Sequence, residues 1–261
     1  MESFPFLSNI FEDESLLVVE KPAGMIVNRA DTTRDVVTLQ DIVENYFKSK
    51  NIELKKSGED IFVDGYSKSD EFINRSGIVH RLDKETSGII IIAKNIASFV
   101  ELQKQFKNGT VKKTYLALVH GRVVPKEGEI NVPIGRLPWN RKRFGVISEG
   151  REAKTLYKVL EYREFSHDKK KEELSLVEVY PQTGRTHQIR VHFQYLNHPI
   201  FSDELYAGRK ISRDDRKILK RHFLHASKIS FLHPVTHEPL NLEAELSEDL
   251  SEFLHTYTKT H

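Results

Sequence analysis

The chain has no cysteine among its 261 residues, so neither a disulfide framework nor a thiolate metal site is available to it. It also lacks long apolar runs, and no segment approaches the roughly 18 residues of a membrane-spanning helix. The N-terminal sequence MESFPFLSNI has no basic-then-apolar signal pattern. These absences argue against a disulfide-stabilised or membrane-spanning protein, and we expect a cytoplasmic protein without a membrane partner.

A strong net charge is missing as well. The 40 Lys and Arg residues against 38 Asp and Glu residues leave a formal charge of +2, too small to indicate a nucleic-acid partner by itself. The basic residues are nevertheless clustered in two stretches, which contain Arg136, Arg141, Lys142, Arg143 and Arg151, and then Arg209, Lys210, Arg213, Arg216, Lys217, Lys220 and Arg221. Such local patches suit contact with a phosphate backbone, although either one alone fits a solvated charged face equally well.

The composition, with 38% hydrophobic and 30% charged residues, is that of an ordinary globular protein able to bury a sizeable core. Length alone leaves one large or two small domains open. We expect an N-terminal arm over 1–15 and a single catalytic domain over 16–261. Within it, the polar stretch 48–76 predicts a long loop or an insertion.

The most informative stretch runs from Gly77 to Lys94 and reads GIVHRLDKETSGIIIIAK. The β-branched run 89–92 predicts a strand buried on both faces. A polar turn precedes it, and a turn between core segments is held rigidly, as a catalytic group requires. One acid, Asp83, stands there beside Arg81 and Lys84, whose positive charges favour its ionised form.

The periodicity of the remaining chain predicts an α+β fold. Expected strands cover 16–20, 89–93, 114–120, 129–134, 153–162, 174–180 and 225–232, and expected helices cover 39–47, 96–107, 187–196 and 248–257. Thr38, Asn95 and Ser247 are the expected N-caps. Consecutive strands without regular helical crossovers favour a mostly antiparallel, mixed sheet flanked by helices.

Three motifs in this order carry a family resemblance. HRLDKETSG at 80–88 resembles the HRLD-x-x-TSG motif of the RluA-type pseudouridine synthases. PQTGRTHQIRVH at 181–192 resembles the TGRTHQIR segment of that family, and KKTYLALVHG at 112–121 resembles its Tyr-bearing strand. Weaker similarities at 19–24 and 224–226 extend the resemblance over about residues 16 to 245.

The resemblance implies the pseudouridine synthase catalytic fold with a central active-site cleft, acting on a stem-loop of ribosomal or transfer RNA. It implies no cofactor, no obligate protein partner and a monomer. Many relatives carry a small RNA-binding domain before the catalytic one, which we do not expect here. Substrate selection would then come from the catalytic domain and its loops.

The resemblance also assigns roles to residues. Asp83 matches the essential catalytic aspartate, Tyr115 the tyrosine that stacks on the uracil and can transfer a proton, and Arg190 the arginine that pairs with the aspartate. Arg81 matches the side chain that enters the space left by the flipped base. Further predicted substrate contacts are His80, Thr86, Arg185, His187, Leu224 and, in an RNA-gripping loop with Trp139 and Phe144, Arg136, Arg141 and Arg143.

Pseudouridine formation breaks the N1–C1′ bond of uridine and rejoins the rotated uracil through C5. There is no redox change, so no cofactor is needed. One ionised carboxylate can act as a nucleophile at C1′ or as a base at C2′, and the sequence leaves both routes open. A uridine within folded RNA must first be extruded. The spacing of the histidines fits no established metal pattern, and we expect no metal.

One departure from the family pattern lies at Ser202, where relatives usually have Gly before the Asp of a Gly-Asp pair, here Asp203. Three functions stay open: an active RNA uridine isomerase, a catalytically silent RNA-binding or assembly factor on the same fold, and a hydrolase using Asp83 on a glycosidic bond. The presence of Asp83, Tyr115 and Arg190 together favours the first. The target RNA and uridine are not specified by the sequence.

Overall fold

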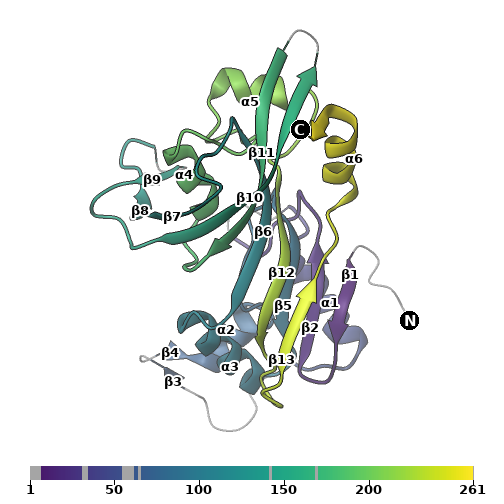
Figure 1. The fold of residues 1–261 in the computed structure, drawn as a ribbon. Coiled ribbons are helices and arrows are strands. Elements are labelled where there is room, and N and C mark those ends of the chain that lie inside the picture. The colour runs from purple at the N-terminus through teal and green to yellow at the C-terminus, as the bar shows by residue number, and fades with distance from the viewer. Residues whose placement is uncertain are drawn as a thin grey trace. The chain divides into compact units, whose positions relative to one another are not determined.

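The structure is a computed structural model that describes residues 7–30, 35–54, 62–63, 66–140, 143–167 and 170–260. Its element order is shown in Figure 1. The chain divides into two compact units, the first formed by Met1–Val111 and Lys228–Ala244, the second by Lys112–Ser227 and Glu245–His261. The single domain over 16–261 stays a prediction.

Three antiparallel strands begin the first unit: β1 (Ser8–Glu12) pairs with β2 (Leu16–Lys21), and β2 pairs with β5 (Ser87–Ala93). Every residue of β5 is buried, as its β-branched run predicts. The second part of β12 (Leu224–Leu232) pairs antiparallel with β13 (Pro239–Glu243). Residues 8–12 of the predicted arm over 1–15 form the paired strand β1, and the arm as a separate part of the chain stays a prediction.

Two helices of the first unit begin at their predicted caps. Thr38 and Asp41 form a capping box at α1 (Leu39–Ser49), and Asn95 accepts a hydrogen bond from the Ser98 N–H at α3 (Ile96–Lys107). The buried face of α3 places Phe99 and Leu102 in a core with β2 and β5. The described part of the stretch 48–76 contains the two-residue strands β3 (Phe62–Val63) and β4 (Tyr66–Ser67) and the helix α2 (Lys68–Asn74).

The second unit is built on long antiparallel strands. In space, β6 (Lys112–His120), β11 (Lys170–Pro181), β10 (Lys154–His167) and β14 (Thr258–Thr260) follow one another, and β7 (Glu127–Asn131) also pairs with β10. A short hairpin consists of β8 (Ile134–Arg136) and β9 (Phe144–Val146). The helices are α4 (Gln188–Tyr195), α5 (Arg209–Asp215) and α6 (Glu248–Tyr257). The predicted α+β class with a mostly antiparallel sheet is confirmed.

Arg221, in the second basic stretch of the sequence, forms an ion pair at the start of α6. Arg221 donates from Nε and Nη2 to the two carboxylate oxygens of Asp249, at 2.7 and 2.8 Å, and from Nη2 to the Ser247 hydroxyl. Ser247 occupies the predicted N-cap position, but its side chain makes no capping hydrogen bond. Arg221 is buried, so its charge is not part of an exposed basic surface.

A buried histidine joins β6 to α5 in the second unit. The two ring nitrogens of His120 lie 2.9 Å from Asp215 Oδ2 and 3.3 Å from Glu172 Oε2. Burial acts to lower the pKa of His120, but the hydrogen bonds and charges of Asp215 and Glu172 outweigh it, so the pKa lies above its ordinary value. The folded state therefore binds this proton more tightly than the unfolded state does.

In the part of the chain that the structure describes, no helix is long and apolar enough to cross a membrane.

We predict that Asn95→Ala lowers the free energy of unfolding by about 1 kcal/mol, because the Ser98 N–H loses its capping acceptor. Urea unfolding at neutral pH measures this change. Asn95→Ser is the control, since a serine hydroxyl also caps, and it should retain most of the stability. An equal loss in both variants would contradict the capping role.

We also predict that His120 makes stability depend on pH. Its raised pKa adds stability that is fully present below the unfolded value, about 6.5, and is lost as pH rises through the folded pKa. His120→Gln should therefore show a smaller fall in unfolding free energy between pH 6 and pH 9 than the wild type. Parallel curves for the two proteins would show that His120 does not titrate in this range.

Candidate active site

The lead into the predicted catalytic turn is fastened to β5 and α3. The backbone N–H of Ile91 donates to His80 Nε2 at 3.0 Å, and the imidazole stacks on Phe106 with ring centroids 4.9 Å apart. Because Nε2 accepts a backbone hydrogen bond, the neutral ring carries its proton on Nδ1. His80 thus fixes the irregular segment that leads to Asp83, and its predicted contact with substrate stays a prediction.

Burial alternates along the next residues. Arg81 is exposed, Leu82 is 5% exposed and Asp83 is partly exposed, so Leu82 packs into the core while its neighbours do not. The Thr86 N–H donates to the Asp83 carbonyl at 3.1 Å and closes a turn over 83–86. Thr86 is itself buried. Asp83 therefore stands at the beginning of a hydrogen-bonded turn that leads directly into β5.

The buried side chain of Lys21 also holds this turn in place. Its side chain is fully buried, and its ammonium donates to the carbonyls of Pro22, Met25 and Lys84 at 2.7, 3.0 and 3.2 Å. The Gly24 N–H adds a bond to the Lys84 carbonyl at 2.8 Å. Lys21 is the last residue of β2, and the motif comparison gave it no role, because its partner Lys84 lies 63 positions away in the sequence.

The second motif forms a turn organised by Gln188. Its Oε1 accepts from the Thr183 hydroxyl at 2.7 Å and the Arg185 N–H at 3.0 Å, and its Nε2 donates to the Lys154 carbonyl and the Thr155 hydroxyl, both at 2.9 Å. Arg185 also donates from Nε to the backbone carbonyl of Glu152, two residues before β10, at 2.9 Å.

His187 follows with a left-handed backbone, φ 57°, and takes the N-cap position of α4. Gln188 is thus the first residue of α4, which carries Arg190 into the interior.

Arg190 forms a buried ion pair that the motif comparison did not predict. Its Nε and Nη2 donate to the two carboxylate oxygens of Asp203 at 2.7 and 2.9 Å. The side chains are 7% and 0% exposed. Burial acts to raise the pKa of Asp203, but the hydrogen bonds and charge of Arg190 outweigh it and hold that pKa below its usual range. The predicted pairing of Arg190 with Asp83 stays a prediction.

Tyr206 links this pair to the hairpin of β8 and β9. The Arg190 guanidinium carbon lies 5.1 Å from the Tyr206 ring centroid, and that of Arg143 lies 5.2 Å from the same ring. The Tyr206 hydroxyl lies 2.8 Å from His187 Nδ1 and accepts the Phe144 N–H at 3.1 Å. One aromatic side chain therefore contacts α4, the hairpin and two arginines.

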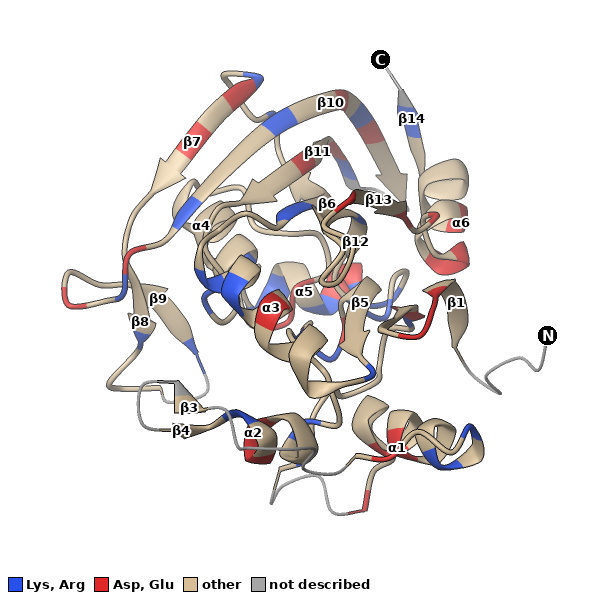
Figure 2. Ribbon diagram, turned by 90° about the horizontal axis from the view of Figure 1, so that it is seen from below, with Lys and Arg blue, Asp and Glu red and all other residues tan. Residues whose placement is uncertain are grey.

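The loop between β8 and β9 presents aromatic and basic groups together. Trp139 is 78% exposed, and the Arg136 guanidinium carbon lies 5.0 Å from the Phe144 ring centroid. Figure 2 shows basic positions at one end of the hairpin strands β8 and β9. Arg141 lies outside the described residues. Cation–π contacts of this kind preorganise an arginine without neutralising its charge.

Two further predicted residues lie elsewhere in the second unit. Tyr115 is partly buried on β6 and packs against the core cluster that also contains Leu224, the first residue of β12. Leu224 is 4% exposed and so is mainly a core residue. The second unit thus brings together Arg143, His187 and Arg190 around Tyr206, with Arg136 over the ring of Phe144, whereas Asp83 and its neighbours belong to the first unit.

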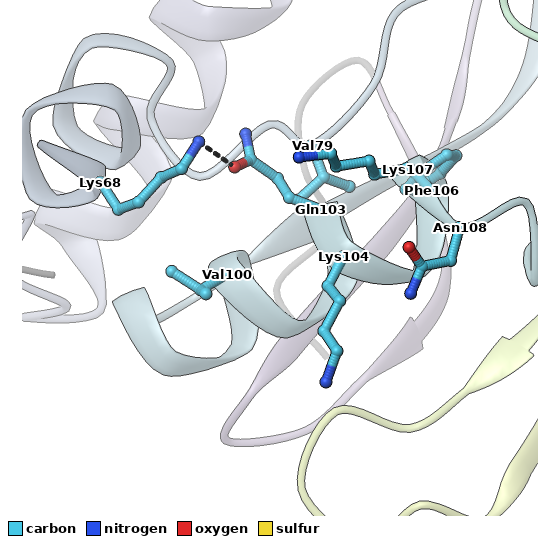
Figure 3. A pocket seen from close by; sticks show the side chains of 8 residues that line it. All are labelled: Lys68, Val79, Val100, Gln103, Lys104, Phe106, Lys107 and Asn108. Carbon is cyan, nitrogen blue, oxygen red and sulfur yellow. Dashed lines mark hydrogen bonds between the residues drawn. The ribbon is translucent and has the colours of Figure 1, made fainter. Parts of the chain in front are cut away.

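A cavity of about 650 Å³ lies in the first unit, next to α3. Figure 3 shows Lys68 of α2 reaching Gln103 of α3, with their hydrogen bond at 2.9 Å. Val79 and Phe106, the neighbours of His80 in sequence and in space, also line it. None of the predicted site residues is among the described residues that form its wall. The cavity is therefore distinct from the residues that the motifs single out.

Comparison with known proteins agrees with the motif resemblance. The sequence model of the RNA pseudouridylate synthase family matches residues 15–195. The chain is 36% identical over 251 residues to the uncharacterized RNA pseudouridine synthase YhcT of Bacillus subtilis (strain 168), covering 96% of this chain and 72% of that protein. It is 34% identical over 255 residues to the ribosomal large subunit pseudouridine synthase D of Neisseria meningitidis serogroup B, covering 95% of this chain and 60% of that protein.

Two human structures have a similar fold. RNA pseudouridylate synthase domain containing 1 has a TM-score of 0.70 and 26% identity, with 100% of this chain and 91% of that chain covered. RNA pseudouridylate synthase domain containing 4 has a TM-score of 0.66 and 23% identity, with coverage of 95% and 92%, and this shows a shared fold. With motifs, fold and relatives in agreement, the chain belongs to the RNA pseudouridylate synthase family, whose members are isomerases.

Proposed function

We propose that this protein isomerises specific uridines in structured RNA, with Asp83 as the catalytic carboxylate. The observation that carries the proposal is the complete HRLD-x-x-TSG motif within the matched family region, with its aspartate partly exposed on a turn held at several points. A carboxylate carried on a backbone held in this way has fewer positions to sample when substrate binds, which favours attack in one geometry.

The reaction balances without a co-reactant. The N1–C1′ bond breaks, the uracil rotates, and a C5–C1′ bond forms. The proton on C5 leaves and N1 ends protonated, so atoms and charge are conserved. Asp83 serves either as the nucleophile at C1′ or as the base that removes the C2′ proton. Tyr115 is proposed to stack on the uracil, and Arg190 to favour the ionised form of Asp83.

The RNA is proposed to be gripped by the hairpin of β8 and β9. Trp139 offers an exposed ring for base stacking, while Arg136 and Arg143 offer charges for phosphates. The Neisseria relative is named as a ribosomal large subunit enzyme, so we propose ribosomal RNA as the first substrate class to test. A catalytically silent RNA-binding factor is the second candidate, because the same hairpin would serve it equally well.

We predict that Asp83→Asn abolishes pseudouridine formation and leaves RNA affinity within about twofold, because Asn keeps the shape but cannot act as nucleophile or base. Pseudouridine formation is measured by position-resolved mapping of RNA from cells lacking the gene, complemented with wild type or variant. RNA affinity is measured by filter binding. One or a few sites should vanish and return only with the wild type. Restoration by Asp83→Asn would favour a role in RNA binding alone, and release of free uracil would favour a hydrolase.

We further predict that Arg136→Ala and Arg143→Ala each weaken RNA binding and lower the slope of log affinity against log salt by about 1 for each phosphate that the variant no longer neutralises. Filter binding across a salt series measures both effects. Lys158→Ala, which removes an exposed cation on β10 that pairs with Glu127, is the matched control. Equal slopes for all three variants and the wild type would mean that the hairpin does not bind the phosphate backbone.

A further inference from the structure

The Arg190–Asp203 pair is costly to place where it lies. Both side chains are almost completely buried, at 7% and 0% exposure, so both charges lose their hydration on folding. A buried ion pair contributes little net stability compared with apolar side chains of similar volume, whereas an unpaired buried charge is strongly destabilising. Stability alone therefore does not account for two charges at this position, and their geometry points to a role for the arginine.

Asp203 is itself held so that it cannot rotate. Its Oδ1 accepts the backbone N–H groups of Leu205 and Tyr206 at 2.9 and 3.1 Å, in addition to Arg190 Nη2. The preceding Ser202 has a left-handed backbone, φ 62°; its N–H donates to Asp215 and its hydroxyl to the Leu219 carbonyl. The carboxylate is thereby fixed in plane and direction.

A fixed carboxylate fixes the guanidinium that it binds. Two parallel N–H···O bonds define the plane of Arg190, and the Tyr206 ring packs against its guanidinium carbon at 5.1 Å. Lysine in place of Arg190 would provide a charge without a defined plane. The structure therefore gives Arg190 one orientation, set by residues 202–206.

We propose that Asp203 is a positioning residue for the isomerisation: it orients Arg190 and acts on the reaction only through it. This inference rests on the proposed function, in which Arg190 favours the reactive form of the catalytic carboxylate. Asp203 does not contact RNA in this scheme. Its loss changes the rate of the chemical step and leaves RNA binding intact.

The first test is Asp203→Asn. Asparagine keeps an oxygen for the Leu205 and Tyr206 N–H groups, but its amide nitrogen cannot accept a hydrogen bond from the arginine. We expect kcat to fall about 100-fold, the loss typical of a misplaced reacting group, with KM for RNA within twofold. Asp249→Asn is the control, because Asp249 binds Arg221 with the same two-bond geometry and neither residue is a predicted site residue. It should lower thermal stability and leave kcat unchanged.

The second test is a double-mutant cycle in single-turnover assays with Arg190→Met, Asp203→Leu and the double variant. If Asp203 acts through Arg190, the double variant has the same residual rate as Arg190→Met alone. The double variant leaves no unpaired buried charge, and in Arg190→Met the Asp203 carboxylate still accepts the N–H groups of Leu205 and Tyr206, so this comparison does not depend on the folding of Asp203→Asn. A further fall in rate in the double variant, an equal fall in Asp249→Asn, or an unchanged kcat in folded Asp203→Asn would overturn the proposal. Failure of the wild type to form pseudouridine would instead remove the proposed function.

Discussion

The requirement that a buried charge be fully hydrogen-bonded shapes the surroundings of the candidate site. Lys21 meets it with three backbone carbonyls, one of which belongs to the turn after Asp83. Arg190 meets it with a carboxylate that accepts two of its N–H groups. Because leaving such a charge unpaired costs several kcal/mol, the chain around each cation has little freedom to rearrange. Rigidity at these turns is thus a consequence of burying charge.

Elements with a strong local signal were predictable from the sequence. Asn95 and the apolar stripe behind it specify α3 to the residue, and the isoleucine run specifies β5. Elements that depend on pairing with distant segments were not predictable from the sequence. The helix α5 is polar and short, and β1 exists through its pairing with β2. Strand β10 extends five residues beyond its predicted end because β11 continues to pair with it.

In the candidate site, too, local motifs were predictable from the sequence and contacts between distant residues were not. Motif spacing singles out Asp83 and Arg190, and the structure places the first on a fastened turn and the second on a helix. The contact between Arg190 and Asp203 spans thirteen positions and depends on a left-handed serine, a conformation that residue type alone does not indicate. Lys21 was overlooked for a similar reason, since its function comes from a carbonyl 63 positions away.

The path of the chain through the two units has a consequence for synthesis and for dissection of the protein. Ile229 and Phe231 complete the core of the first unit, and Phe253 completes that of the second, although both units begin well upstream. During translation, neither core is complete until these residues, which lie in the last quarter of the chain, have been synthesised. Neither unit is a continuous segment, so no single cut of the gene separates them, and a nascent chain that stops before β12 leaves two open cores.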